Sequence, residues 1–229
     1  MGFIQEGILQ AFALLLEGDP ATYSAISTTL RASFLAMAAS LVLGIPCGYM
    51  LGYFNFRMKK QIRVIVDTLL SLPTVFIGLV IYALLMRRGP LGEAGLLFTI
   101  PGIAIGQAIL ALPIIIALTA TAVEAADSNL RITLMSLGAN RRQIAGSTLL
   151  EVRLGILAAA VTATGRVLTE VGISLMVGGN IKWHTRTITT AIALETSKGE
   201  FGMGIALGLV LLLIALVVNV SLAGLRRRI

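Results

Sequence analysis

The sequence has few charged residues and only one cysteine, one histidine and one tryptophan. Charged residues make up 13% of its 229 positions, which is about half the share in soluble domains. The single cysteine, Cys47, excludes an internal disulfide framework. The phosphate-binding pattern G-x-x-x-x-G-K-[ST] is absent, and no His/Cys/Asp/Glu cluster has metal-ligand spacing. We therefore expect no bound ATP, metal ion or other cofactor in this chain, and we find no catalytic residues.

Hydrophobic residues, by contrast, make up 57% of the chain. Five apolar runs are each long enough to cross a bilayer, which takes about 20 helical residues. They lie at 27–52, 64–86, 97–122, 153–178 and 203–224. A chain of this composition cannot hide its apolar surface in one soluble core. It is predicted to be an all-α integral membrane protein with about five transmembrane helices.

Lysine and arginine are divided unevenly between the segments that flank these runs. The larger group, on one side, is Arg57, Lys59, Lys60, Arg63, Arg131, Arg141, Arg142, Arg153, Arg226, Arg227 and Arg228. The other side has Arg87, Arg88, Lys182, Arg186 and Lys198. The positive-inside rule places the larger group in the cytoplasm, with the N-terminus outside and the C-terminus inside. The net charge of +7 is then mostly a topology signal, and we expect no nucleic-acid partner.

The first 22 residues form a separate N-terminal element in this interpretation. The stretch MGFIQEGILQAFALLLEGDP has neither the basic start nor the cleavage site of a signal peptide. Its apolar run is short for a span. We predict an interfacial helix that ends at Gly18-Asp19-Pro20, followed by the membrane domain over 23–229. A sixth span is the alternative.

The longest cytoplasmic segment in this orientation is the loop 124–152. Asp127 or Ser128 can cap a short helix, and Gly138 fits the left-handed stop after it. Asn140 can cap a second helix, with Gln143 three residues on as in a capping box. The loop is therefore predicted to be two helices joined by a sharp glycine bend.

Several residues of this loop are apolar although they lie outside the bilayer. Such residues need a partner surface, which can be the protein's own helices or a separate cytoplasmic subunit. The candidate docking residues are Ile132, Leu134, Met135, Leu137, Gly138, Ala139, Asn140, Arg141 and Arg142.

This loop resembles the coupling loop of permease subunits of binding-protein-dependent ABC importers. The family pattern is EAA, three residues, Gly, nine residues, then I-x-L-P. Gly138 and Leu150 match it, but the leading Glu and the closing Pro are absent, and residues 132–134 stand where EAA is expected. A literal Glu124-Ala125-Ala126 lies eight residues upstream, at the end of the third apolar run. We expect the docking element at Gly138 and not at this literal EAA.

Three further stretches, 71–92, 165–181 and 185–202, are similar to tungstate-type permeases, and more loosely to molybdate and sulfate permeases. With the loop, the resemblance covers most of 20–224. It implies the transmembrane domain of a type I ABC importer that forms a homodimer. It also implies two cytoplasmic ATPase subunits that bind ATP and Mg, and an extracytoplasmic solute-binding protein that delivers an oxyanion, with tungstate as the first candidate.

The fourth apolar run carries Arg166 and Glu170, which are four residues apart and so on one helical face. Each charge would cost ~2.5–3.5 kcal/mol if it were unpaired at the bilayer centre. We therefore predict that the two residues pair and face protein or water. The pair can serve as a structural ion pair or as a gate element.

An oxyanion pathway needs donors that bind the anion without holding it, such as hydroxyls and helix ends. Proline in a span interrupts the helical ladder, which fits either a cavity or an ordinary kink. The pathway candidates are Pro73, Thr74, Thr162, Arg166, Thr169, Glu170 and Ser174. The outside segment 179–201 can close the pathway or meet a binding protein.

Three alternatives remain open at this point. A molybdate, sulfate or phosphate permease belongs to the same class. A self-sufficient secondary transporter would favour internal repeats and intramembrane carboxylates, for which Glu170 and Asp67 are the candidates. A membrane scaffold would not need the charges at Arg166 and Glu170.

Overall fold

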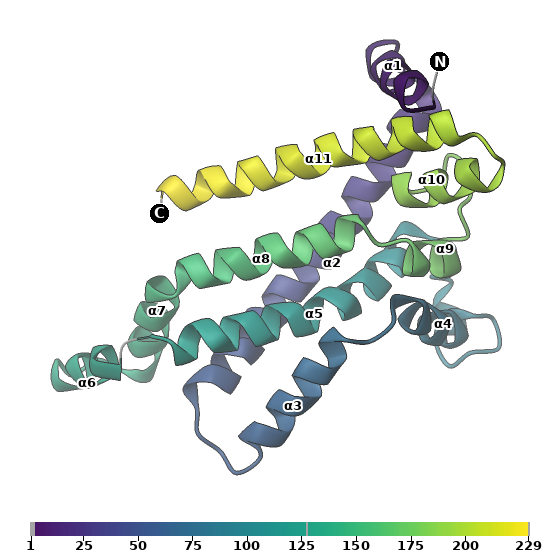
Figure 1. The fold of residues 1–229 in the computed structure, drawn as a ribbon. Coiled ribbons are helices and arrows are strands. Elements are labelled where there is room, and N and C mark those ends of the chain that lie inside the picture. Colours follow the sequence, from purple (N-terminus) through teal and green to yellow (C-terminus); the bar gives the residue numbers. More distant parts are fainter. Residues whose placement is uncertain (1–2, 127, 229) are drawn as a thin grey trace.

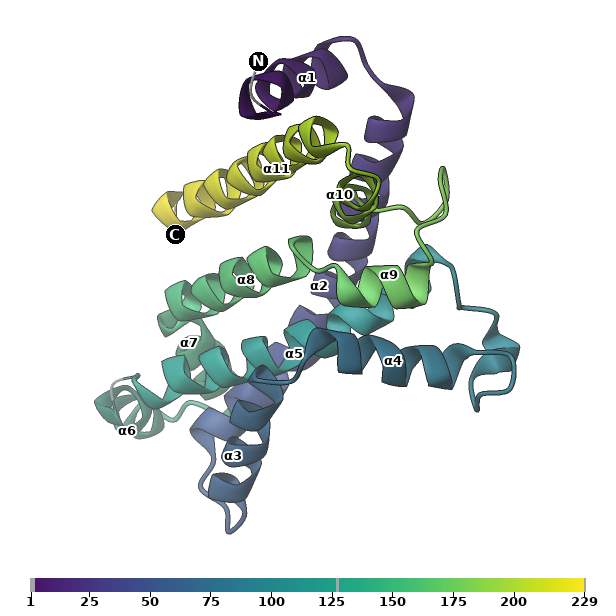
Figure 2. The same ribbon diagram turned by 45° about the vertical axis from the view of Figure 1, so that its right-hand side comes forward.

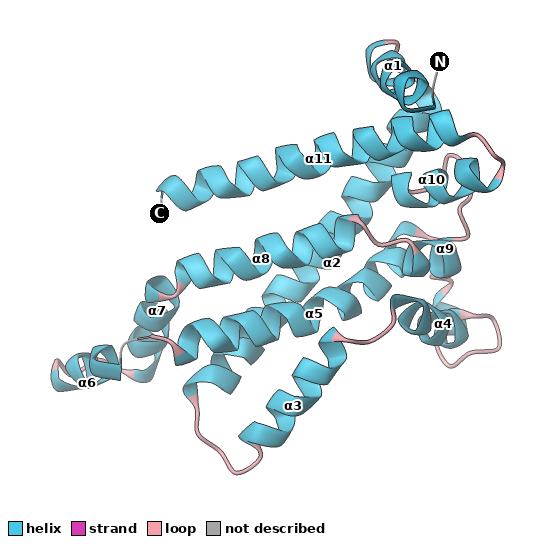
Figure 3. Cartoon of the chain, viewed as in Figure 1, coloured by secondary structure: helices cyan, strands magenta, loops and turns pink. Residues whose placement is uncertain are grey.

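The computed structural model describes residues 3–126 and 128–228. Every regular element in these ranges is a helix (Figure 3). The helices are α1 (Phe3–Leu16), α2 (Pro20–Tyr53), α3 (Lys59–Leu70), α4 (Thr74–Leu85), the 3-10 turn η1 (Gly92–Ala94), α5 (Ile100–Glu124), α6 (Ser128–Ser136), α7 (Arg141–Glu151), α8 (Arg153–Leu168), α9 (Gly172–Gly178), α10 (Ile188–Ser197) and α11 (Phe201–Arg228). The predicted all-α class is confirmed.

Three helices, α2, α5 and α11, are long and apolar enough to cross a bilayer by themselves. Of these, α2 and α5 form the most extensive helix pair. Gly44, Gly48 and Gly52 line one face of α2 at intervals of four residues, and a Cβ at Gly48 would lie 2.7 Å from Thr119 Cβ of α5. Small residues at this spacing let two helix backbones approach closely inside a membrane.

The second predicted span, 64–86, is not one straight helix. The axes of α3 and α4 differ by 97°, and the break lies between Leu70 and Thr74. Pro73 explains this break, because a proline has no amide donor and disfavours helical backbone at the preceding Leu72. Pro113 lies inside α5, which continues through it from Ile100 to Glu124. Pro73 therefore lies at a break between two helices, whereas Pro113 does not interrupt α5.

The fourth predicted span, 153–178, is also divided. Helix α8 ends at Leu168 and α9 begins at Gly172. At its other end, α8 meets α7 at an angle of 63°. Five membrane crossings result only if each bent pair, α3 with α4 and α7 with α8, forms one span.

Helix α4 packs against α9 and α5. Ile77 and Ile81 of α4 share a buried cluster with Ile173 and Val177 of α9. A Cβ at Gly78 would lie 3.2 Å from the Ile173 Cα, so this contact is tight. In Figures 1 and 2, α4, α9 and α10 lie at the end of the molecule opposite to α6 and α7.

The N-terminal helix α1 has 14 residues, or about 21 Å, which is shorter than the apolar core of a bilayer. It packs on the start of α11, where a Cβ at Gly7 would lie 2.6 Å from Ile205 Cγ2. The predicted turn follows it, with Gly18 at φ +73°. Asp19 caps α2, because its carboxylate accepts hydrogen bonds from Thr22 N at 2.7 Å and Thr22 Oγ1 at 2.6 Å. The Thr22 hydroxyl lowers the pKa of Asp19 below its ordinary value.

The arrangement of helix ends agrees with the predicted topology. The C-terminal ends of α2, α5 and α11 lie at the same end of the molecule as α6 and α7 (Figure 1). This is the end at which the larger group of basic residues is expected. The orientation with the N-terminus outside and the C-terminus inside remains a prediction.

Candidate functional site

The bend of the loop 124–152 has the local geometry that its sequence predicts. Gly138 has φ +75°, in the left-handed region. Gly138 N donates to Met135 O and Ala139 N donates to Leu134 O, both at 3.0 Å. These two bonds form the Schellman motif that ends α6. Asp127, one of the two predicted caps of α6, lies outside the described residues.

The second helix of the loop begins at a capping box. Gln143 N donates to Asn140 Oδ1 at 3.0 Å, and Asn140 N donates to Gln143 Oε1 at 2.8 Å. This arrangement satisfies two of the free amide groups at the start of α7. We call residues 132–143, which include the end of α6 and the start of α7, the coupling elbow.

The elbow exposes apolar side chains at the surface of the protomer. The exposed fractions are 62% for Ile132, 57% for Met135 and 78% for Leu137. Arg141 and Arg142 are also exposed, whereas Leu134 and Ala139 are half-buried. Leucine and isoleucine exposed on a segment outside the spans are typical of a surface that another chain covers.

An aromatic cluster lies beside the elbow and was missed by the sequence analysis. Tyr49 and Tyr53, near the end of α2, stack at 5.0 Å between ring centroids, and Phe54 meets Tyr53 edge-on. Together with Met135 and Ile144 these rings line a cavity of about 340 Å³. The elbow therefore borders a cavity with an aromatic wall.

The literal EAA is engaged within the chain. Glu124, its first residue, lies 3.0 Å from Lys59 Nζ and 3.5 Å from Arg63 Nη1. These contacts join the end of α5 to α3. Glu124 therefore has partners in its own protomer, unlike the apolar side chains of the elbow.

Helix α8 carries a stripe of exposed residues that includes three of the predicted pathway residues. Thr162, Arg166 and Thr169 are all exposed in the protomer. Thr162 and Arg166 are four residues apart on one face of α8. Thr169, the C-cap residue, continues this face because its amide still donates to Gly165 O at 3.3 Å. The Thr162 hydroxyl donates to Ala158 O and the Thr169 hydroxyl to Gly165 O, so their protons are used by the backbone. Arg166 is then the principal hydrogen-bond donor of this stripe.

The predicted pairing of Arg166 with Glu170 is wrong for this structure. Helix α8 ends at Leu168, so the two residues do not share a helical face. Among the described residues, no ion pair joins them. Glu170 is 3% exposed, and its Oε1 accepts a hydrogen bond from Ile173 N in the first turn of α9 at 3.1 Å. Glu170 therefore caps a helix start, where the partial positive charge of the amide groups favours a carboxylate.

The other predicted pathway residues lie elsewhere. Pro73 is the exposed residue directly before α4, and Thr74 is the half-buried first residue of that helix. Ser174 of α9 is fully buried, and its hydroxyl lies 3.4 Å from Gln107 Nε2 of α5. Ser174 therefore joins two helices and does not line an open surface in this structure.

A network of buried threonines surrounds the break between α8 and α9. The Thr189 hydroxyl donates to Glu170 O at 2.9 Å and also contacts Thr187 Oγ1. Ile188 N, at the start of α10, donates to Thr29 Oγ1 of α2 at 3.0 Å. This network holds α2, α9 and α10 together. The threonine-rich stretch TRTITT at 185–190 was the available sequence signal, but it contributed above only to the family resemblance and not to a predicted site.

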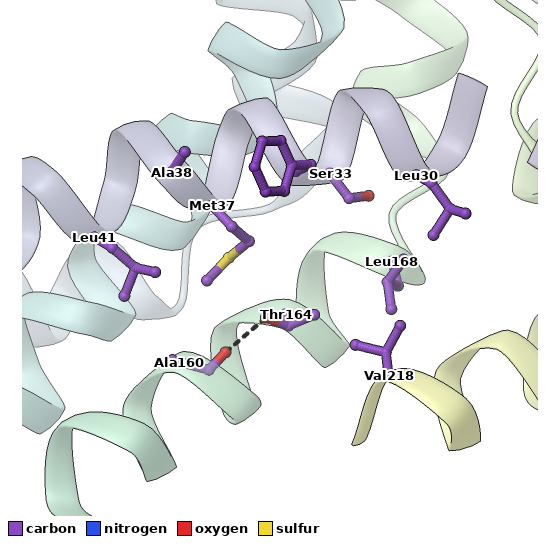
Figure 4. A pocket seen from close by; sticks show the side chains of 10 residues that line it. Leu30, Ser33, Met37, Ala38, Leu41, Ala160, Thr164, Leu168 and Val218 are labelled. Atoms are coloured by element: carbon purple, nitrogen blue, oxygen red, sulfur yellow. Dashed lines mark hydrogen bonds between the residues drawn. The ribbon is translucent and has the colours of Figure 1, made fainter. Parts of the chain in front are cut away.

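An apolar cavity of about 410 Å³ lies between α2, α8 and α11 (Figure 4). Thr164 and Leu168 of α8 face it, and so does Val218 of α11. Val218 lies three residues before the end of Phe201–Ser221, the part of α11 that is long and apolar enough to cross a membrane, so the cavity borders that part. Arg166 points about 160° away from Thr164 and from Leu168, because each helical residue turns by about 100° and two residues separate it from each. The polar stripe therefore faces away from this cavity.

The fold is that of an ABC transporter membrane subunit. A solved structure of the MetNI methionine ABC transporter aligns with a TM-score of 0.74, covering 91% of this chain and 95% of that chain at 18% identity. A solved amino acid ABC transporter with histidines aligns with a TM-score of 0.68 at 15% identity, covering 95% and 98% of the two chains. The predicted fold, the transmembrane domain of a type I ABC importer, is confirmed.

Residues 44–229 match the family described as binding-protein-dependent transport system inner membrane component, and the chain belongs to this family. It is a multi-pass protein of the cell membrane. The tungstate uptake system permease protein TupB of Campylobacter jejuni is 46% identical over 219 residues, covering 96% of this chain and 92% of that protein. TupB of Peptoclostridium acidaminophilum is 39% identical, covering 96% of both chains. The molybdenum permease ModB of Escherichia coli K12 is 30% identical, covering 86% of this chain and 93% of ModB.

Proposed function

We propose that this chain is the permease subunit of an ATP-driven importer that carries tungstate across the cell membrane. The similarity to a tungstate uptake permease, at 46% identity over 96% of the chain, carries this proposal. The two chains match over nearly their whole lengths, 96% of this chain and 92% of the relative. The molybdenum permease ModB matches at a lower identity of 30%, which favours tungstate over molybdate as the substrate.

The coupling elbow is the proposed docking surface for an ATPase subunit. Its exposed Ile132, Met135 and Leu137 supply an apolar contact, and the adjacent aromatic cavity accepts a side chain from the partner. The exposed Asn140, Arg141 and Arg142 add polar contacts at the rim. Two copies of the chain would present two elbows to two ATPases. Those ATPases would bind ATP and Mg, for which this sequence has no phosphate-binding loop.

The exposed stripe of α8 is the proposed lining of the pathway. Arg166 cannot be left against lipid without a cost of ~2.5–3.5 kcal/mol near the bilayer centre. It therefore needs water or a second copy of the chain in front of it. A homodimer in which the two α8 stripes face a shared pathway satisfies this need. In that arrangement Arg166 contributes the positive charge that attracts an oxyanion, and an extracytoplasmic binding protein delivers the anion.

Uptake measurements test the substrate directly. Cells that lack this gene should lose high-affinity tungstate accumulation, measured by mass spectrometry of washed cells, and should regain it from a plasmid copy. Molybdate and sulfate in excess should compete poorly. If molybdate or sulfate abolishes tungstate uptake at equal concentration, the chain belongs with the alternative anion permeases. Sulfate permeases are also among its relatives, at 24% identity.

The same cells distinguish an ABC importer from a self-sufficient secondary transporter. Inactivation of the partner ATPase should stop uptake completely while the membrane potential is intact. Uptake that continues and collapses with a proton ionophore would instead support the secondary transporter.

A further inference from the structure

Four charged or polar groups meet at the end of the molecule where α2, α3 and α5 come together. Glu124 is the last residue of α5 and the first residue of the loop 124–152. Its Oε1 lies 3.0 Å from Lys59 Nζ, and its Oε2 lies 3.5 Å from Arg63 Nη1. Lys59 and Arg63 are one turn apart on α3. Both face the same carboxylate.

Two hydrogen bonds extend this cluster to the neighbouring backbone and side chains. Arg63 Nη2 donates to Thr121 Oγ1 of α5 at 2.6 Å, and Lys59 Nζ donates to Gly52 O of α2 at 3.1 Å. The contact between Arg63 Nη1 and Glu124 lacks hydrogen-bond geometry and is a charge contact only. The side chains of Lys59 and Arg63 are 22% and 27% exposed and that of Glu124 is 39% exposed, so solvent screens the carboxylate more than the two cations.

Apart from this cluster, little holds α3 to the rest of the protomer. Val66 is its one buried residue, in a small core with Leu51, Ala117 and Ala120. Helix α3 continues through the bend at Pro73 into α4, and α4 packs on α9 through Gly78 and Ile173. These contacts join α3 to α4, and α4 to α9.

Basic residues at this end also serve as a topology signal, and for that role they need only be solvated. Solvation alone does not explain the geometry, because the Glu124 carboxylate of α5 lies between Lys59 and Arg63 of α3. We propose that Glu124 is a positioning residue that ties the root of the coupling loop to α3. When an ATPase moves the elbow, Glu124 carries α3 with it and so moves α4 and α9. This inference rests on the proposed docking of an ATPase at the elbow. It assigns the literal EAA a role in coupling without contact to the ATPase.

The test uses the complete transporter, with its ATPase subunits and binding protein, in proteoliposomes. Glu124→Gln keeps the shape of the side chain and removes its charge. We expect the ATPase to remain bound to this variant, and the tungstate transported per ATP hydrolysed to fall by about two- to tenfold. Glu124→Asp should recover part of the loss, because it keeps the charge on a shorter side chain.

Asp67→Asn is the matched control. Asp67 lies 3.6 Å from Arg63 Nε on the same helix, so it does not join α3 to another element. Its transport per ATP should stay at the wild-type value. The variant with Lys59→Met and Arg63→Met should reproduce the loss in Glu124→Gln. Adding Glu124→Gln to this double variant should change the transport per ATP little, since the contacts of Glu124 with Lys59 and Arg63 are already lost.

The outcomes separate this inference from the proposed function. Wild-type transport per ATP in Glu124→Gln would overturn the inference and leave the proposed function intact. Loss of the ATPase from Glu124→Gln would also overturn it, because Glu124 would then belong to the docking surface. If the wild-type complex transports no tungstate or binds no ATPase, the proposed function itself fails.

Discussion

Leu137 in the coupling elbow is 78% exposed, whereas Glu170 at the break between α8 and α9 is 3% exposed. The elbow satisfies its backbone with local caps and turns its apolar side chains outward. The α8–α9 break buries a carboxylate and several hydroxyls and bonds them across three helices. Exposed apolar side chains need a partner to cover them. Buried polar groups that already have hydrogen-bond partners do not need another chain. Damage at the elbow should therefore affect assembly, and damage at the joint should affect the stability of the chain itself.

The largest expected effect comes from a charge on the elbow. Leu137→Arg places a guanidinium where an ATPase is proposed to cover leucine. Co-purification of the ATPase with this variant should fall about 30-fold or more, since a buried interface residue often contributes at least 2 kcal/mol. The variant should still insert and fold. Leu16→Arg is the control, because Leu16 is 83% exposed on α1, far from the elbow, and should keep the ATPase.

The buried joint is expected to respond in stability. Glu170→Ala leaves Ile173 N without its acceptor in a buried site, which costs roughly 1–3 kcal/mol. Arg166→Met should have a small effect on stability, and the double variant should be additive within ~0.5 kcal/mol. Thermal unfolding in detergent measures all three variants. A clearly non-additive double variant would show that Arg166 and Glu170 interact, which would contradict the structure.

A smaller effect is expected from the backbone of the elbow. Gly138→Val forces a β-branched residue into the left-handed region, at a cost of roughly 1–2 kcal/mol. Nothing lies within 4 Å of a Cβ at this position, so the cost comes from the backbone and not from a clash. Gly138→Asn should be close to wild type, because asparagine tolerates this conformation. ATPase binding that is equal in the two variants would mean that the bend is not needed.

The smallest effect is expected outside the compared regions, at the cap of α2. Asp19→Ala should lower stability at neutral pH by about 1 kcal/mol, whereas Asp19→Asn should keep most of the cap. The pKa of Asp19 is lowered by Thr22, so the ionised cap stabilises the folded state above the ordinary pKa of the group. This contribution is lost as the pH falls through the lowered pKa. The difference between wild type and Asp19→Ala should therefore shrink below pH about 4. A constant difference across pH would argue against the charged cap.

The sequence predicted the elbow well because its chemistry is local. Gly138, Asn140 and Gln143 lie within six residues, and their conformational preferences act over one helical turn. The approximate positions of the apolar helices were also predictable, since length and hydropathy determine them. The number of crossings was not, because two of the five predicted spans are divided by bends. The bend at Pro73 was predictable in kind, but its angle depends on how α4 packs on α9.

The sequence could not reveal contacts between distant segments. Glu124 is 61 residues from Arg63 and 65 from Lys59, and Gln107 is 67 residues from Ser174. The end of α8 at Leu168 has no proline or glycine directly after it. The break after it is stabilised by the Thr189 hydroxyl, which bonds Glu170 O, and by the Glu170 side chain, which caps the start of α9. The sequence contains these residues, but only the fold shows that they meet. For this reason the helical spacing of Arg166 and Glu170 gave a wrong pairing.

Site-specific cross-linking tests the central claim, that the elbow and not the literal EAA meets the ATPase. The exposed Cys47 is replaced by serine, and single cysteines are introduced by Leu137→Cys or Glu124→Cys. Each is labelled with benzophenone maleimide in membranes that contain the partner subunits, and irradiated. The account predicts a strong adduct between this chain and the ATPase from residue 137 and none from residue 124. An adduct from residue 124 with none from residue 137 would contradict it.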